Sequence, residues 1–219
     1  MLLLFPGQGS QKVGMGRHLW EECPQAEATF AEAEEILGWD LRKLCAEGPQ
    51  EELTRTDKAQ PAIFVTGVAA YRALQELGLS FEVAAGHSLG EYGALVACGQ
   101  LTFADALTVV AARGKAMWRC GLEQSGTMAA IVGLDEAEVE AICAEVEGAW
   151  PANYNSLGQV VVSGSLEGVE RAMAAARERG AKRVLPLEVS GAFHSPLVAG
   201  AAKELAEVLD RVQVQEPVG

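Results

Sequence analysis

The chain has 219 residues, of which 49% are hydrophobic, and a formal net charge of −13. This length allows one large domain or a core with a smaller insert, and the composition is sufficient for a buried core. The negative charge argues against binding to nucleic acid or to an anionic membrane surface, because both would repel the protein. Neither kind of partner is expected.

The cysteines fit neither a disulfide framework nor a zinc site. They are odd in number, widely spread and without a C-x-x-C pair: Cys23, Cys45, Cys98, Cys120 and Cys143. We expect reduced thiols in the cytoplasm and no bound metal. The N-terminus lacks a basic start and no apolar run reaches membrane-spanning length, so neither a signal peptide nor a spanning helix is predicted.

The first predicted element is a short buried strand, Leu2 to Phe5. The loop that follows, PGQGSQ at 6–11, exposes backbone N–H groups that suit an oxyanion or a phosphate, although it lacks the lysine of a P-loop. An ordinary strand-to-helix connection is the alternative. Two amphipathic helices are predicted next, at 24–37 and 60–77, each followed by a glycine.

The stretch FEVAAGHSLGEYGALV at 81–96 predicts a strand, a tight turn and a helix. Ser88 lies at the turn, in the spacing G-x-S-x-G, where flanking glycines leave it room to project. The Leu89 N–H then lies at a helix start, where unpaired backbone donors can stabilise an oxyanion. The pattern predicts a nucleophilic Ser88, and a glycine-rich turn with an idle serine is the alternative.

A further helix begins after Thr102, which has capping-box spacing to Asp105. Arg113 lies on this helix. Most helical arginines are solvated or ion-paired at a surface, so the pattern alone assigns Arg113 no function.

From Thr127 onward the pattern indicates a second unit. Its predicted elements are a strand at 128–132, a helix at 135–147, strands at 150–154 and 159–163, a helix at 166–179 and a strand at 183–189. This β-α-β-β-α-β order is that of a ferredoxin-like unit. We therefore expect a ferredoxin-like subdomain at 125–189, inserted into a hydrolase-like α/β core with a mainly parallel sheet, formed by 1–124 and 190–219.

His194 is the best candidate for a general base. It lies in the loop where the predicted insert rejoins the core, whereas His87 adjoins Ser88 and should point away from it. The alternative is a helix-capping or surface histidine. The aspartates between Ser88 and His194 fit helix starts, so a Ser-His dyad is the simpler prediction.

Four segments together resemble the malonyl-CoA:acyl-carrier-protein transacylases of type II fatty acid synthesis. They are FPGQGSQ at 5–11, GHSLGEYGAL at 86–95, Arg113, and GAFHSP at 191–196. The acyltransferase domains of polyketide synthases are similar too. The resemblance implies transfer of malonyl from malonyl-CoA to the phosphopantetheine thiol of acyl carrier protein through a malonyl-serine. It implies no cofactor or metal, and we expect a monomer.

Carried over by position, the resemblance makes Ser88 the nucleophile and His194 its base. It assigns the oxyanion hole to the backbone N–H groups of Gln8 and Leu89.

The resemblance also implies two selectivity residues. Arg113 falls where the family binds the free carboxylate of malonate, which a guanidinium can meet bidentately. Phe193 matches malonyl-selective members, because a bulky ring leaves little room for the methyl group of methylmalonate.

Family members usually continue well beyond the position of Gly219, through strands that finish the core sheet. This chain ends in an apparent linker at 216–219, so we expect its C-terminal part to be missing.

Two other functions remain open. A serine thioesterase or hydrolase would use the same Ser-His pair with water as acceptor, and a truncated relic would bind a partner without turnover. Carrier proteins of this pathway are typically acidic, so local basic residues of the insert are the hypothesised contact or, alternatively, a solvated helix face. They are Arg171, Arg177, Arg179, Lys182 and Arg183.

Overall fold

The computed structural model describes residues 1–217, and the chain forms two compact units. The first unit contains Met1–Lys115 and the chain from Glu204 onward, and the second contains Ala116–Lys203. The subdomain expected at 125–189 falls inside the second unit. Of the expected C-terminal linker, Val218 and Gly219 lie outside the described residues.

The sheet of the first unit consists of two parallel strands in the described chain, β1 (Leu2–Phe5) and β2 (Val83–Gly86). Both strands were predicted, but the expectation that 2–5 is a buried strand is wrong, because Leu2 and Leu4 are 54% and 71% exposed and only Phe5 is buried. Phe5 lies at the carboxyl end of β1 and is buried against Tyr71, with the two rings edge to face at 6.5 Å. The carboxyl end of each strand leads directly into a predicted site segment.

The rest of the first unit is mainly helical, and α6 (Gly90–Ala97) is the helix that packs on these strands. The other helices are α1 (Arg17–Glu22), α2 (Pro24–Leu37), α3 (Leu41–Glu47), α4 (Gln50–Thr54) and α5 (Thr56–Glu76), and α7 (Phe103–Glu123) begins in this unit. Three of them, α1, α3 and α4, were not predicted, because helices of five to seven residues are too short to show a clear period. Helix α5 begins four residues before the expected start.

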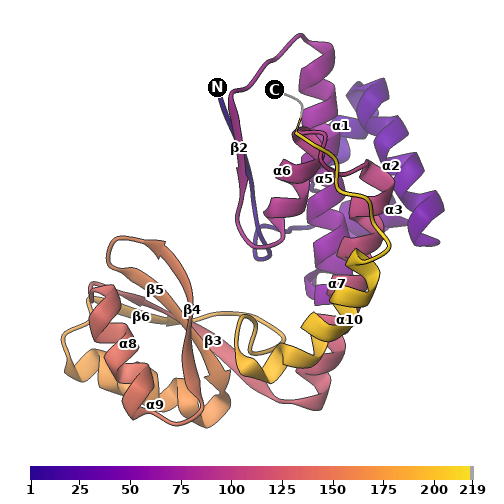
Figure 1. Ribbon diagram of the computed structural model, residues 1–219. Helices are drawn as coiled ribbons and strands as arrows, with labels where there is room; N and C mark the ends of the chain where they lie inside the picture. Colours follow the sequence, from indigo (N-terminus) through magenta and orange to yellow (C-terminus); the bar gives the residue numbers. More distant parts are fainter. Residues whose placement is uncertain (218–219) are drawn as a thin grey trace. The chain divides into compact units, whose positions relative to one another are not determined.

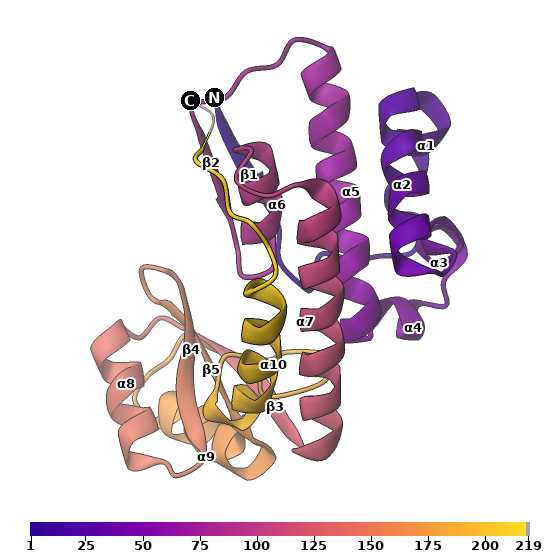
Figure 2. The same ribbon diagram turned by 45° about the vertical axis from the view of Figure 1, so that its right-hand side comes forward.

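The hydrophobic core of the first unit is built around α5. Figure 2 shows α5 between α2 on one side and α6 on the other. Phe30 of α2 and Val65 of α5 are fully buried, and the rings of Phe64 and Phe103 stack at 5.6 Å. Since α5 carries buried residues on most of its circumference, its two buried polar residues, Thr56 and Gln60, are enclosed by packed neighbours.

The second unit has the predicted β-α-β-β-α-β order. Its elements are β3 (Gly126–Val132), α8 (Glu136–Glu145), β4 (Ala149–Ser156), β5 (Gln159–Ser165), α9 (Leu166–Glu178) and β6 (Arg183–Pro186). The strands form an antiparallel sheet in the order β4-β5-β3-β6. The last strand is shorter than the expected 183–189 and ends at a proline, which cannot donate to the ladder.

The two faces of this sheet are both covered. Helices α8 and α9 lie on one face (Figure 1), where Ile131 and Val162 pack against Ile142. The other face carries Met128 and a cluster that includes Phe193. After β6 the chain forms a 3-10 turn, η1 (Pro196–Val198), and a last helix, α10 (Ala199–Leu209).

None of the helices in the described part of the chain has the length and apolar character that a bilayer-spanning segment requires.

Candidate active site

Ser88 lies in the turn between β2 and α6 with a backbone φ of 52°. Among residues 1–217, the only other non-glycine residue with a positive φ is His194, at 58°. Such conformations cost on the order of 1–3 kcal/mol and cluster at active sites, because the surrounding structure has to enforce them. The two residues predicted to be nucleophile and base are therefore the two strained ones.

The glycines of the G-x-S-x-G motif bring backbone against backbone. A Cβ on Gly86 would lie 1.9 Å from the carbonyl carbon of Gly90, and a Cβ on Gly90 would lie 2.1 Å from the carbonyl oxygen of Phe5. The sequence predicts that these glycines leave space for the Ser88 side chain to project. The structure adds that the start of α6 crosses β1 too closely for any side chain.

Arg113 contacts the predicted nucleophile. Its Nη2 donates a hydrogen bond to Ser88 Oγ at 3.0 Å, and its Nη1 donates to Gln60 Oε1 at 2.7 Å. Burial lowers the pKa of the Arg113 guanidinium, because desolvation disfavours the charged form. No carboxylate in the described part of the chain forms an ion pair with it. A half-buried cation without a carboxylate partner beside a serine suits an acyl group that brings its own anion.

Gln60 is a site residue that was not predicted from the sequence. It is fully buried, and its Nε2 donates to Gln8 Oε1 at 3.4 Å, while Gln8 Nε2 donates to Thr56 Oγ1 at 3.0 Å. From the sequence, Gln60 was expected only to begin a helix. The available signal was a glutamine within a run of buried residues, between Ala59 and Pro61.

The two predicted oxyanion donors lie in loops that touch. A Cβ on Gly7 would lie 2.6 Å from the carbonyl oxygen of His87, so the loop carrying Gln8 packs directly on the turn carrying Leu89. Within residues 1–217, the N–H of Gln8 and that of Leu89 donate to no backbone carbonyl. Both donors therefore have capacity for an oxyanion.

His194 and Phe193 lie in the second unit, whereas Ser88, Arg113, Gln8 and Leu89 lie in the first.

The loop around His194 is firmly held. Phe193 is 5% exposed, and Ser195 Oγ donates to the Ala192 carbonyl at 2.6 Å and accepts from Leu197 N–H at 3.3 Å. The side chain of His194 itself is exposed. Its pairing with Ser88 stays a prediction.

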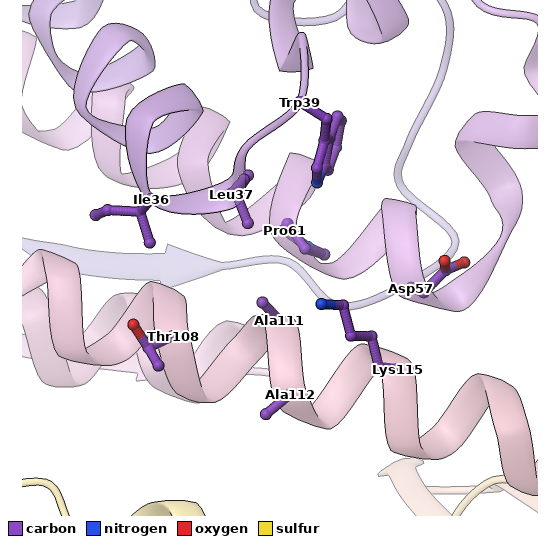
Figure 3. Close-up of a pocket in the computed structure, with 9 residues that line it drawn as sticks. All are labelled: Ile36, Leu37, Trp39, Asp57, Pro61, Thr108, Ala111, Ala112 and Lys115. Carbon is purple, nitrogen blue, oxygen red and sulfur yellow. The ribbon is translucent and has the colours of Figure 1, made fainter.

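A separate cavity of about 300 Å³ lies in the first unit between α2, α5 and α7 (Figure 3). Its lining includes the aromatic ring of Trp39 and the charged side chains of Asp57 and Lys115. None of the six predicted site residues lines it. The cavity therefore contributes nothing to the site around Ser88.

Comparison with known proteins identifies the family. The acyl transferase domain family matches residues 2–218. Two relatives named malonyl CoA-acyl carrier protein transacylase, from Bacillus subtilis strain 168 and Escherichia coli strain K12, are each 48% identical to the chain. The alignments cover 97% and 98% of the chain and 68% and 71% of those relatives. The chain belongs to the malonyl CoA-acyl carrier protein transacylase family.

A solved structure supports the family membership and the fold. The complex of a type II polyketide acyl carrier protein with its malonyl-transacylase, PlMCAT:AntF, has 45% identity to the chain and a TM-score of 0.94. The match covers 99% of the chain and 71% of that structure. This family member is thus an acyltransferase with an α/β fold, and it spans about 70% of the length of the transacylases that it matches.

Proposed function

We propose that the protein transfers the malonyl group from malonyl-CoA to the phosphopantetheine thiol of acyl carrier protein and so supplies fatty acid elongation. The main support for this proposal is the position of the Arg113 guanidinium, whose Nη2 lies 3.0 Å from Ser88 Oγ. Among residues 1–217, no carboxylate forms an ion pair with it. A nucleophile beside such a cation favours an acyl group that ends in a carboxylate. The related transacylases are named for malonyl-CoA and acyl carrier protein, and one of them was solved in complex with a carrier protein.

In the proposed architecture, 1–124 and 190–219 form a hydrolase-like catalytic core, and 125–189 form a ferredoxin-like subdomain. The order β-α-β-β-α-β and the strand order β4-β5-β3-β6 support the second assignment. We place the protein in the cytoplasm, a setting that suits the five unpaired cysteines.

Acyl transfer proceeds in two proposed steps. His194 takes the proton of Ser88 Oγ, which attacks the thioester carbonyl carbon; the carbon–sulfur bond breaks, and the coenzyme A thiolate leaves with the proton from His194. The carrier-protein thiol then gives a proton to His194 and attacks the malonyl ester. The carbon–oxygen bond breaks, and Ser88 Oγ recovers the proton.

The backbone N–H groups of Gln8 and Leu89 would stabilise the oxyanion of each step. Preorganised donors of this kind contribute about 3–4 kcal/mol each to the transition state, because they need no reorganisation. Their proposed role is supported by the direct contact of the two loops at Gly7 and His87.

Intact-mass analysis after mixing with malonyl-CoA tests the proposed function. We expect a malonyl adduct on the wild-type protein, loss of the adduct in Ser88→Ala, and its retention in Ser156→Ala, which removes an exposed hydroxyl. Adding carrier protein should clear the adduct and yield malonyl carrier protein. Clearance by water at the same rate without carrier would instead indicate a thioesterase, and a folded protein without adduct would refute the assignment.

Arg113→Ala should remove the preference for malonyl over acetyl. In the wild-type protein, an acetyl group leaves the guanidinium desolvated and without an anion, at a cost of about 3–5 kcal/mol, or roughly a hundred- to several-thousand-fold. Malonyl transfer should therefore fall in Arg113→Ala while acetyl transfer holds or improves. Arg113→Lys should restore little, because an ammonium lacks the planar fork. Phe193, which we propose excludes the methyl branch of methylmalonate, is unchanged in both Arg113 variants.

The control for Arg113→Ala is Lys115→Ala, which removes one positive charge from the same helix on the side of the Figure 3 cavity. It should leave kcat/KM for both thioesters unchanged. If Arg113→Ala folds and keeps its preference for malonyl, the selectivity mechanism is refuted.

A further inference from the structure

Gln60 joins the two parts of the proposed site that lie in the first unit. It accepts from Arg113 through Oε1 and donates to Gln8 through Nε2, at 2.7 Å and 3.4 Å. Its side chain is fully buried, although glutamine is seldom found in such a position. A buried carboxamide with both ends engaged is held in one orientation.

The direction of this hydrogen-bond chain is set by Arg113. A guanidinium has donors only, so the carboxamide oxygen of Gln60 has to face it and the nitrogen has to face Gln8. Gln8 in turn accepts through Oε1 and donates through Nε2 to Thr56 Oγ1 at 3.0 Å. The charge at Arg113 thereby fixes the orientation of the Gln8 side chain, two hydrogen bonds away.

The helices that carry this chain approach closely at the same point. A Cβ on Gly114 would lie 3.0 Å from the carbonyl oxygen of Thr56, so α7 meets the first turn of α5 backbone to backbone. Gly114 adjoins Arg113, and Thr56 is one helical turn before Gln60. The close approach leaves Gln60 and Arg113 little freedom to separate.

We propose that Gln60 is a positioning residue for acyl selectivity, which holds one edge of the Arg113 guanidinium so that the other edge faces the acyl group on Ser88. This inference rests on the proposed malonyl transfer. In the described chain, Nη1 of Arg113 is engaged by Gln60, and Nη2 contacts Ser88 Oγ at 3.0 Å. A substrate carboxylate would be met by a guanidinium that is already oriented, which reduces the entropy lost on binding.

Two substitutions separate positioning from charge. Gln60→Met keeps an unbranched side chain of similar length and removes both hydrogen bonds. We expect kcat/KM for malonyl-CoA to fall about 10- to 100-fold, the size of one lost hydrogen bond to a charged group, with little change for acetyl-CoA. Gln60→Glu places a carboxylate on the edge of Arg113 that Gln60 holds, so it keeps the hydrogen bond but neutralises the guanidinium and weakens its attraction for the malonyl carboxylate. We expect KM for malonyl-CoA to rise at least about tenfold with kcat largely retained.

The control is Gln75→Met, the same exchange at an exposed position of α5. It should leave both thioesters unaffected. Thermal unfolding of each variant shows which are folded. If Gln60→Met does not fold, the test of the positioning role rests on Gln60→Glu.

The outcomes separate this inference from the proposed function. A wild-type protein that takes acetyl as readily as malonyl overturns the proposed function and the inference with it. A malonyl-selective wild type whose folded Gln60 variants keep the malonyl-to-acetyl ratio overturns the inference alone. Equal losses for both thioesters show a merely structural Gln60 and also overturn it. Selective loss of malonyl transfer in the Gln60 variants, but not in Gln75→Met, supports it.

Discussion

The backbone at Ser88 is held in its left-handed conformation by hydrogen bonds on both sides of the residue. His87 N–H donates to the Phe5 carbonyl at 3.1 Å, and Gly90 N–H donates to the His87 carbonyl at 3.0 Å. These bonds tie the turn to β1 and to the start of α6. A strained residue persists when its neighbours determine its conformation in this way, and the strain keeps the hydroxyl group outside the helix.

Two serines of β5 should respond to alanine substitution in opposite directions. Ser163 is fully buried, and its Oγ has no hydrogen-bond partner in the described structure, whereas Ser165 Oγ accepts from Gly168 N–H at 3.0 Å and caps α9. Ser163→Ala should raise the free energy of unfolding by about 1 kcal/mol, because it removes an unsatisfied polar group. Ser165→Ala should lower it by about 1 kcal/mol.

Urea denaturation of both serine variants provides the measurement, and each serves as the control for the other. A loss of stability in Ser163→Ala equal to that in Ser165→Ala would contradict the assignment of an unsatisfied hydroxyl.

At the scale of elements, the crossing of α6 over β1 determines where Ser88 lies. Gly93, one turn further along α6, faces the Phe5 ring, and a Cβ there would lie 2.5 Å from ring carbon Cδ1. Three glycines therefore let a strand–turn–helix unit close up: Gly86, Gly90 and Gly93. This close approach places the N-terminus of α6, with its unpaired N–H groups, behind the nucleophile.

Gly90→Ala should destabilise the protein, although alanine is normally the better helix former. The new Cβ would lie 2.1 Å from the Phe5 carbonyl oxygen, a backbone atom that cannot rotate away. Overpacking of this kind costs about 3 kcal/mol, more than the roughly 1 kcal/mol gained in helix propensity. We expect the melting temperature to fall by several degrees, with roughly 2–4 °C for each kcal/mol.

The control for Gly90→Ala is Gly200→Ala near the start of α10. A Cβ there would lie 3.5 Å from Cys120 Sγ, an ordinary contact, so this variant should melt at the wild-type temperature or above. Equal melting temperatures for both variants would show that the start of α6 is looser than described.

For the whole molecule, the net charge of −13 is unfavourable for an acidic carrier protein, so local positive charge has to compensate. Two of the basic residues hypothesised for this contact already have partners. Arg179 forms an ion pair with Glu145, and Arg171 donates to the Glu147 carbonyl at 2.7 Å. The hypothesis therefore narrows to Arg177, Lys182 and Arg183, which are exposed on the same unit.

Reversing charge at Arg177 and Arg183 together should raise KM for carrier protein several-fold and reduce its dependence on salt, with KM for malonyl-CoA unchanged. Exposed charges at an interface act mainly on association, and salt screens them. The matched control reverses Lys43 and Arg211, two exposed charges of the first unit. Equal effects of the two double variants on the carrier-protein KM would refute a local docking surface.

Alkaline pH should weaken the folded state through Cys45. Burial raises the pKa of this thiol from 9.0 to about 12. The unfolded chain releases the proton first, so the stabilisation is complete below pH 9 and is lost as the pH rises toward 12, with a slope of up to about 1.4 kcal/mol per pH unit. Urea midpoints at pH 8, 9, 10 and 11 should fall less steeply in Cys45→Ala than in Cys23→Ala. Parallel declines would contradict this assignment.

The sequence by itself determined the elements with strong periodicity and the motif of the turn. Helix α2, the β-α-β-β-α-β order and the strand–turn–helix around Ser88 were predicted, because local spacing and capping residues specify them. The short helices α1, α3 and α4 were not, since five to seven residues carry little periodic signal.

Only the tertiary structure decided which side chains surround Ser88. Arg113 lies 25 residues from Ser88 along the chain and Gln60 lies 53 residues from Arg113, yet each pair is joined by a hydrogen bond. Nothing in the spacing of these residues indicates such contacts, because they depend on how closely α5 and α7 approach at Gly114. The site therefore required the packing of three helices on one strand–turn unit, which no local pattern encodes.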